Sequence, residues 1–283
     1  MKRVLLIVNP TRPAAAKFAN ELSTKFTKHG FDVLSNYPNL VTGSSAINEV
    51  RDADWAIVLG GDGTILRAAE IVRGHKVPII GINLGNVGFL AEISQPSIEE
   101  IVSSVVNSEI HVEPRILLKY EVSRGAKVVS TSWALNEISI ERSSTQMLEL
   151  FLQIDGRPLS KWGCDGVICS TPTGSTAYAF SAGGPVVWPE VNALVLLPLA
   201  AHALFSRPMV VSPDCEIVID VRSESAQVSA DGLRHFELKE NDRIVITKDA
   251  HIVELAYINP GNFTDRLVAK FKLPIEGWRG ENS

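Results

Sequence analysis

The sequence predicts an α/β domain followed by an all-β domain, because its hydrophobic period changes partway along the chain. In the first third, short apolar runs such as Arg3–Val8 and Trp55–Leu59 alternate with stretches in which apolar residues recur every three or four positions. From Glu113 to about Leu255, most segments are short, rich in β-forming residues and separated by turn residues. The first pattern is typical of a doubly wound α/β sheet, and the second is typical of a β-sandwich.

Strands and helices alternate along the first part of the chain. Gly30 follows a stretch of helical period, where a glycine can end a helix in the left-handed conformation. Ser97, with Glu100 three residues later, is the signature of a capping box at a helix N-terminus. The predicted strands are Arg3–Val8, Phe31–Leu34, Trp55–Leu59 and Val77–Ile82, and the predicted helices lie around 18–26, 65–72 and 98–106.

The change of pattern falls near His111, so we expect a domain boundary near residue 112. Turn pairs such as Asp155-Gly156 separate the β-rich segments that follow. A helical period returns near the C-terminus, in the stretch FTDRLVAKF. The chain contains no internal repeat and no low-complexity segment.

Composition indicates a globular protein without a nucleic-acid partner. Apolar residues make up 45% of the 283 residues, charged residues make up 21%, and the net charge is −5. A negative chain lacks the overall basic surface that nucleic-acid binding requires. The three cysteines, Cys164, Cys169 and Cys215, form no CxxC pair, which favours a reducing cytoplasm.

No segment is predicted to enter a membrane. The apolar run VLLIV after Lys2 and Arg3 is shorter than the ~7 residues that the core of a signal peptide needs. The stretch ALVLLPLAAHALF, which starts at Ala193, is shorter than the ~18 residues of a membrane span and contains Pro198 and His202. We expect this stretch to lie in the protein core, and we expect a cytoplasmic protein with no membrane partner.

A glycine-rich loop follows the predicted strand Trp55–Leu59 and opens a predicted helix. Glycines allow the backbone to approach a ligand, and the N-terminus of the helix favours an anion such as a phosphate. A carboxylate in such a loop repels phosphate unless it binds Mg²⁺ or accepts a proton from an attacking hydroxyl. The alternative to a phosphate-binding loop is a structural Gly-Asp turn between the strand and the helix. The loop matches neither the Walker A motif nor the GxGxxG motif. The loop residues are Gly60, Gly61, Asp62, Gly63 and Thr64.

The GGDGT loop resembles the nucleotide loop of a kinase superfamily. This superfamily includes NAD kinases, diacylglycerol and sphingosine-type lipid kinases and, with Ser in place of Thr, the ATP-dependent phosphofructokinases. The motif alone does not choose among these families.

Motifs in the rest of the chain resemble those of NAD kinases, in the same order. They cover most of the chain, from about residue 4 to residue 280. The matching segments are Gly85–Leu90, Asn136-Glu137, Asp165–Tyr178, Ser181–Pro185, Pro198–Pro208 and Ser229–Gly232. Leu233 stands where the family commonly has Gln, so the resemblance assigns no polar side-chain contact to that position.

The resemblance implies a two-domain enzyme that transfers the γ-phosphoryl group of ATP to the 2′-hydroxyl of the adenosine ribose of NAD, giving NADP. It implies an α/β donor domain of residues 1–112 and 257–283, because the last residues of the family pack on the first domain. It implies a β-rich NAD-binding domain of residues 113–256. It also implies Mg²⁺ or another divalent cation with ATP, polyphosphate as a second possible donor, and a homodimer or homotetramer.

The resemblance also implies roles for individual residues. Asp62 would orient or deprotonate the acceptor hydroxyl. No protein side chain is assigned as a ligand of the divalent cation. The donor phosphates would lie on Gly60, Gly61, Gly63 and Thr64. The NAD-binding residues would be Asn136, Glu137, Asp165, Thr173, Thr176, Ala177, Tyr178 and Ser181, with Tyr178 stacking on a ring.

Taken one at a time, several of these residues have ordinary structural interpretations. Asn136-Glu137 alone is typical of a polar pair at a strand edge, and Thr171–Tyr178 alone is typical of an irregular turn. His202 alone indicates a packed structural histidine, and Asp231-Gly232 alone indicates a hairpin turn. Their joint occurrence in one order favours the binding roles.

Three other functions compete with an NAD kinase. A lipid kinase would share the GGDGT loop but would favour an exposed basic or apolar surface for the membrane, and no basic amphipathic helix is evident. A non-catalytic NAD-binding or sensing protein would be indicated by loss of Asp62 or of the Asn136-Glu137 pair, and all three residues are present. A phosphofructokinase would need sugar-phosphate arginine motifs that the sequence does not show.

The sequence does not decide whether the acceptor is NAD or NADH.

Overall fold

The computed structural model describes residues 2–9, 13–35, 50, 53–85 and 88–274. The chain divides into two compact units. One contains Met1–Pro114 and Val253–Ser283, and the other contains Arg115–Ile252. The long strands β5 (His111–Arg124) and β16 (Asp242–Tyr257) each contribute residues to both units.

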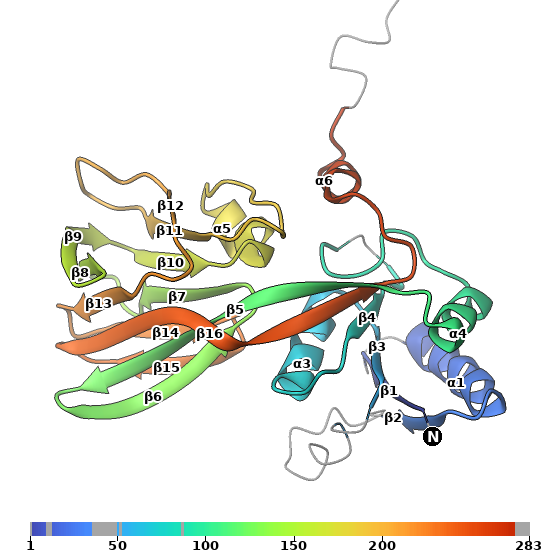
Figure 1. Ribbon diagram of the computed structural model, residues 1–283. Coiled ribbons are helices and arrows are strands. Elements are labelled where there is room, and N and C mark those ends of the chain that lie inside the picture. Colours follow the sequence, from blue (N-terminus) through green and yellow to red (C-terminus); the bar gives the residue numbers. More distant parts are fainter. Residues whose placement is uncertain (1, 10–12, 36–49, 51–52, 86–87, 275–283) are drawn as a thin grey trace, which may run out of the picture. The chain divides into compact units, whose positions relative to one another are not determined.

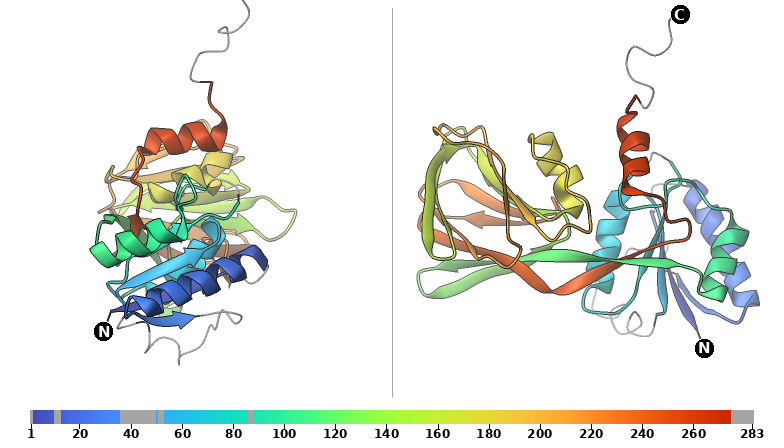
Figure 2. Two further views of the ribbon diagram at one scale, coloured as in Figure 1. Left: turned by 90° about the vertical axis from the view of Figure 1, so that its right-hand side faces the viewer. Right: turned by 45° about the horizontal axis from the view of Figure 1, so that its top comes forward.

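The first unit is built on a parallel sheet with the strand order β2-β1-β3-β4. The end of β16 extends this sheet, because Leu255 and Ala256 pair with β4 in parallel. Helices α1 and α4 lie side by side on one face of the sheet, and α3 lies on the other (Figures 1 and 2). The elements are β1 (Arg3–Val8), α1 (Pro13–Lys28), β2 (Asp32–Ser35), β3 (Trp55–Leu59), α3 (Asp62–Val72), β4 (Ile79–Ile82), α4 (Ile98–Asn107) and α6 (Phe263–Phe271).

Helices on both faces explain why the central strands are apolar along their whole length. Residues 4–8 of β1 and all of β4 are buried. The predicted helix signals are also confirmed. Gly30 has φ 79°, and the Ser97 hydroxyl accepts a hydrogen bond from the backbone N–H of Glu100 at 3.2 Å. The predicted doubly wound α/β domain is therefore confirmed.

The second unit is a sandwich of antiparallel sheets. One sheet has the order β12-β11-β10-β7-β14-β15, and the facing strands are β16, β13, β8 and β9, with β5 and β6 paired beside β16. The elements are β6 (Lys127–Ala134), β7 (Glu137–Arg142), β8 (Leu148–Ile154), β9 (Arg157–Cys164), β10 (Gly166–Ser170), η1 (Thr173–Thr176), α5 (Tyr178–Ser181), β11 (Leu194–Leu199), β12 (Met209–Val211), β13 (Ile217–Val221), β14 (Ala226–Ala230) and β15 (Arg234–Leu238).

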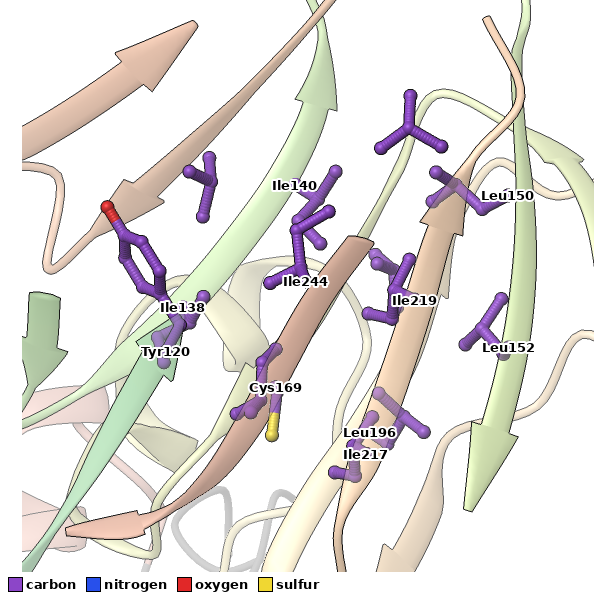
Figure 3. Close-up of a cluster of buried hydrophobic side chains, with 14 of the residues drawn as sticks. Tyr120, Ile138, Ile140, Leu150, Leu152, Cys169, Leu196, Ile217, Ile219 and Ile244 are labelled. Carbon is purple, nitrogen blue, oxygen red and sulfur yellow. The ribbon is translucent and has the colours of Figure 1, made fainter. Parts of the chain in front are cut away.

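The two layers enclose one apolar core, which confirms the predicted β-sandwich (Figure 3). Ile140 and Cys169 come from one sheet, and Leu150, Ile219 and Ile244 come from the other. All five side chains are at most 1% exposed. This packing fixes β7 and β10 in place, and the predicted NAD-binding residues of this unit lie at and after the ends of these two strands.

One expectation for the second unit is wrong. Only Leu194–Leu199 of the apolar stretch after Ala193 forms a buried strand. Beyond it Ala200 takes φ 44°, the chain leaves the sheet, and Leu204 and Phe205 are 112% and 57% exposed. His202 is also exposed rather than packed, although its backbone N–H bonds to the oxygen of Gly163 at 2.8 Å. Apolar composition alone could not show where the strand leaves the core. Among the described residues, no helix is long and apolar enough to span a membrane.

Candidate functional site

The glycine loop connects β3 to α3, and Gly61 is the N-cap residue of that helix. A side chain at Gly60 would lie 2.4 Å from Oγ1 of Thr64, so only glycine fits there without a shift. Among the described residues, apart from the adjoining chain, no atom lies within 4 Å of the position of a Cβ at Gly61 or Gly63. The backbone of this turn is therefore accessible at a helix N-terminus, where an anion is favoured.

The Asp62 carboxylate is held in one orientation by two backbone amides of the same unit. The N–H of Phe89 donates to Oδ2 at 3.0 Å, and the N–H of Leu90 donates to Oδ1 at 3.2 Å. A Cβ at Gly88 would lie 2.1 Å from Oδ1, so any other residue there would force the carboxylate to shift from this position. A carboxylate oxygen can accept more than one hydrogen bond, so each can also accept one from a hydroxyl.

In the second unit, Asp231 organises the turn between β6 and β7. Its carboxylate accepts hydrogen bonds from the backbone N–H groups of Leu135 at 2.9 Å, Asn136 at 2.7 Å and Glu137 at 3.4 Å. Asp231 and Gly232 have φ 54° and 63°, as in the predicted hairpin turn between β14 and β15. The sequence indicated this turn but not that its side chain would hold the Asn136-Glu137 pair.

Arg234 supports Asp231 from the neighbouring strand. Its Nη2 donates to Oδ2 of Asp231 at 2.9 Å and to the backbone oxygen of Trp133 at 2.7 Å. Its guanidinium carbon lies 4.4 Å from the ring centroid of Trp133. Burial raises the pKa of Asp231, and the backbone amides and the Arg234 charge oppose that rise. Asp231 is buried, with 8% of the residue exposed, and these hydrogen bonds and the Arg234 charge offset the cost of burying its carboxylate.

Glu137 is a buried carboxyl group with one unused oxygen. The residue is 7% exposed, and its Oε2 has no hydrogen-bond partner among the described residues. Burial raises the pKa of Glu137 to about 8, and the charge of Asp231 raises it further. The Tyr178 amide lowers it, and the charge of Glu141 adds the smallest rise. A buried acceptor without a partner is costly, and polar ligands commonly satisfy such groups.

The segment after β10 wraps the Asn136-Glu137 turn. The Thr171 hydroxyl donates to the Leu135 oxygen at 2.6 Å, and the Thr171 N–H donates to the Asn136 oxygen at 2.9 Å. A Cβ at Gly174 would lie 2.1 Å from the Asn136 oxygen, so this close approach requires glycine. The structure therefore brings Asn136 and Glu137 together with the predicted residues of η1 and α5.

Part of the predicted set lines a pocket of about 530 Å³ in the second unit. Asp165, Tyr178 and Ser181 lie in its wall, whereas Thr173, Thr176 and Ala177 do not. The wall also includes Glu141 and Arg142, which sequence reasoning missed. A signal was available for Glu141, because it lies two and four residues after Ser139 and Glu137 and strand side chains alternate between faces. The same alternation gives no signal for Arg142.

The missed residues hold the predicted ones in place. The Tyr178 hydroxyl donates to Glu141 Oε2 at 3.1 Å, and Arg142 Nε pairs with Asp165 Oδ1 at 2.8 Å. Partial burial and the Glu141 carboxylate raise the pKa of Tyr178 to about 12. The phenol therefore stays protonated at neutral pH and acts as a hydrogen-bond donor.

The predicted site residues thus form two clusters, each within its own unit. The first contains Asp62 and the glycine loop, and the second contains the Asn136-Glu137 turn and the wall of the pocket. In the part of the chain that the structure describes, no group of three or more His, Cys, Asp or Glu side chains could hold a metal ion. The geometry offers an anion-favouring loop with a fixed carboxylate in one unit. In the other unit it offers a pocket lined by polar side chains and, on the Asn136-Glu137 turn, a buried carboxyl oxygen without a partner among the described residues.

Comparison with known families identifies what this geometry resembles. Residues 42–110 match the model of the ATP-NAD kinase N-terminal domain, and residues 135–256 match that of the ATP-NAD kinase C-terminal domain. The NAD kinase of Leifsonia xyli subsp. xyli is 50% identical over 255 residues, covering 88% of this chain and 84% of that protein. NAD kinase 2 of Streptomyces avermitilis is 49% identical over 294 residues, covering 99% of this chain and 97% of that protein.

Two solved structures share the fold. Yeast NADH kinase complexed with NADH has a TM-score of 0.88 at 22% identity, covering 100% of this chain and 90% of that one. An NAD kinase from Archaeoglobus fulgidus in complex with ATP has a TM-score of 0.73 at 29% identity, covering 95% of this chain and 98% of that one.

The raised pKa of Glu137 makes the stability of the protein depend on pH. The folded protein holds the Glu137 proton up to about pH 8, whereas an ordinary glutamate has a pKa of 4.5. The stabilisation from this group is therefore fully present below about pH 4.5 and is lost as the pH rises through about 8. We expect wild type to lose unfolding free energy relative to Glu137→Gln between these pH values, measured by denaturant titration.

Glu121→Gln, on an exposed position of β5, controls for the general loss of a carboxylate. A stability difference between wild type and Glu137→Gln that stays constant over this pH range would show that Glu137 titrates as an ordinary glutamate.

Proposed function

Since the chain belongs to the ATP-NAD kinase family and phosphorylates NAD to NADP, we propose that the two clusters bind the phosphoryl donor and the dinucleotide respectively. In this proposal the first unit binds ATP, the second binds NAD, and the acceptor is the 2′-hydroxyl of the adenosine ribose. The observation that carries it is the Asp62 carboxylate, held by the amides of Phe89 and Leu90 within a loop that otherwise favours phosphate. Family membership also removes the lipid-kinase, phosphofructokinase and sensor alternatives.

Asp62 would accept a hydrogen bond from the acceptor hydroxyl and orient it toward the γ-phosphorus. Phosphoryl transfer passes through a loose transition state, so positioning contributes more than removal of the proton. As the bond between the ribose oxygen and the γ-phosphorus forms, the bond from that phosphorus to the β,γ-bridging oxygen breaks, ADP leaves, and the hydroxyl proton passes to Asp62 or to solvent. The fixed carboxylate supports this role because it needs no rearrangement before the reaction.

The glycine loop would bind the donor phosphates. Gly61 and Gly63 present open backbone at the start of α3, and the helix dipole favours the negative charge there. Gly60 and Thr64 shape the turn by their close contact. Mg²⁺ bound to the phosphates would neutralise charge on the transferred group, and the protein need supply no cage, because Mg²⁺ in kinases is held largely by phosphates and water.

The second cluster would bind NAD. Glu137 Oε2 is a buried oxygen that a ribose hydroxyl could satisfy, and Asn136 lies beside it on the turn held by Asp231. Asp165, Tyr178 and Ser181 line the pocket, and the Tyr178 side chain, whose residue is 37% exposed, could stack on a ring of the dinucleotide. Thr173, Thr176 and Ala177 would shape the backbone around these contacts.

We also propose a homodimer or homotetramer in the cytoplasm. The exposed side chains of Leu204 and Phe205 support association, because apolar groups of this size are usually covered in an assembly. The three free cysteines, all buried, are consistent with a reducing compartment.

A coupled assay of NADP⁺ formation tests the donor. Purified protein with Mg²⁺-ATP and NAD⁺ should form NADP⁺, and a parallel sample should receive polyphosphate in place of ATP. Product with ATP alone would define an ATP-specific enzyme, and product in both would define a donor site that accepts either. Absence of product from folded protein that still binds NAD⁺ would contradict the proposed reaction.

Asp62→Asn should lower kcat by about 10²-fold or more while NAD⁺ binding stays within about twofold, because a positioned group of this kind contributes on that scale. Steady-state kinetics and calorimetry would measure the two quantities. Glu70→Gln, on the same helix at an exposed position, is the matched carboxylate-to-amide control. Wild-type turnover in Asp62→Asn would remove Asp62 from the reaction.

Glu137→Ala should weaken NAD⁺ binding by about tenfold or more, because a lost hydrogen bond at a buried site costs on the order of 1–3 kcal/mol. The dissociation constant from calorimetry is the readout, and Glu121→Ala provides an exposed control. Unchanged affinity in Glu137→Ala would place Glu137 outside the NAD site.

A further inference from the structure

The backbone segment Gly88–Glu92 separates two groups of contacts in the first unit. On one side, the amides of Phe89 and Leu90 hold the Asp62 carboxylate. On another side, Glu92 joins the segment to the sheet, because its N–H donates to the Gly81 oxygen of β4 at 2.8 Å. The position of this segment therefore determines where the Asp62 carboxylate points.

The end of β16 and helix α6 hold the same segment through polar contacts. Nη1 of Arg266 donates to the backbone oxygen of Ala91. The carboxylate of Glu92 accepts from the N–H of Ile258 and, at 3.4 Å, from the N–H of Asn259. Glu92 and Arg266 are 1% and 4% exposed, so both charged groups are buried beside the segment that orients Asp62.

Aromatic contacts hold the segment from the same helix. The Phe89 ring lies 6.1 Å from the Phe263 ring and 5.6 Å from the Phe271 ring, measured between centroids. The guanidinium carbon of Arg266 lies 4.3 Å from the centroid of the buried Tyr257 ring, which fixes the arginine over the end of β16. The segment is thus held at Phe89 by packing and at Ala91 and Glu92 by hydrogen bonds.

We propose that Arg266 is a positioning residue for Asp62, acting through the backbone of residues 89–91. In the part of the chain that the structure describes, Arg266 makes no hydrogen bond to the Asp62 carboxylate. It donates instead to the Ala91 carbonyl, two residues from the amide that holds Oδ2. Burying a charged arginine carries a desolvation cost. We infer that this cost is tolerated because Arg266 fixes the geometry of the segment. The inference rests on the proposed role of Asp62 in turnover.

The test is a double-mutant cycle on the full-length protein. Arg266→Gln should lower kcat by about 10-fold to 100-fold, since a displacement of about 1 Å in a positioned group costs on that order. KM for NAD⁺ should stay within about twofold. In the Asp62→Asn background, the same change should lower kcat by no more than about twofold, because the orientation of Asp62 no longer contributes.

Arg266→Lys keeps the charge and one hydrogen-bond donor, so it should restore part of the lost turnover, and it carries the same cycle if Arg266→Gln does not fold. Lys270→Gln removes a positive charge from an exposed position of α6 and should keep the wild-type kcat. A wild-type kcat in Arg266→Gln would overturn the inference, as would equal losses in both backgrounds.

The cycle separates this inference from the proposed function. If Asp62→Asn alone keeps wild-type turnover, the role of Asp62 is wrong and the inference falls with it. If Asp62→Asn loses turnover while Arg266→Gln does not, only the role of Arg266 is wrong.

Discussion

Each loop of the candidate site is held by a carboxylate that accepts hydrogen bonds from neighbouring backbone amides. Asp62 accepts from Phe89 and Leu90, Glu92 accepts from Ile258 and Asn259, and Asp231 accepts from three amides at 135–137. Loop amides have no partner in a sheet ladder, so a side chain or a ligand must satisfy them. A carboxylate satisfies several at once and fixes the loop at the same time.

Burying these carboxylates costs free energy. Burial raises the pKa of Glu137, and the charge of the nearby Asp231 raises it further. The unused Oε2 of Glu137 costs on the order of 1–3 kcal/mol in the free protein. A ligand hydroxyl that bonds to it recovers that energy, so the unfavourable group in the free enzyme becomes a favourable contact in the complex.

Local patterns in the sequence were sufficient for the elements but not for the contacts between them. Strands β1 and β3 were predicted with the bounds that the structure shows, because their apolar runs end at clear turn residues. The link from Asp231 to Asn136 joins residues 95 positions apart, and no local period encodes it. Neither does any pattern reveal that the chain leaves the core after Leu199, which is why the exposure of Leu204 and Phe205 was missed.

The C-terminal helix α6 lies outside the two regions that match the family models. The matched regions end at residues 110 and 256, so Arg266 and the amides of Ile258 and Asn259 lie beyond both. The residues that hold the Asp62 loop nevertheless come from this region, through Ala91 and Glu92. The segment that holds the Asp62 carboxylate is thus in contact with the last described helix, because the sheet brings β4 and the end of β16 together as parallel neighbours. The fold, rather than the motif, sets the direction of the group that the motif supplies.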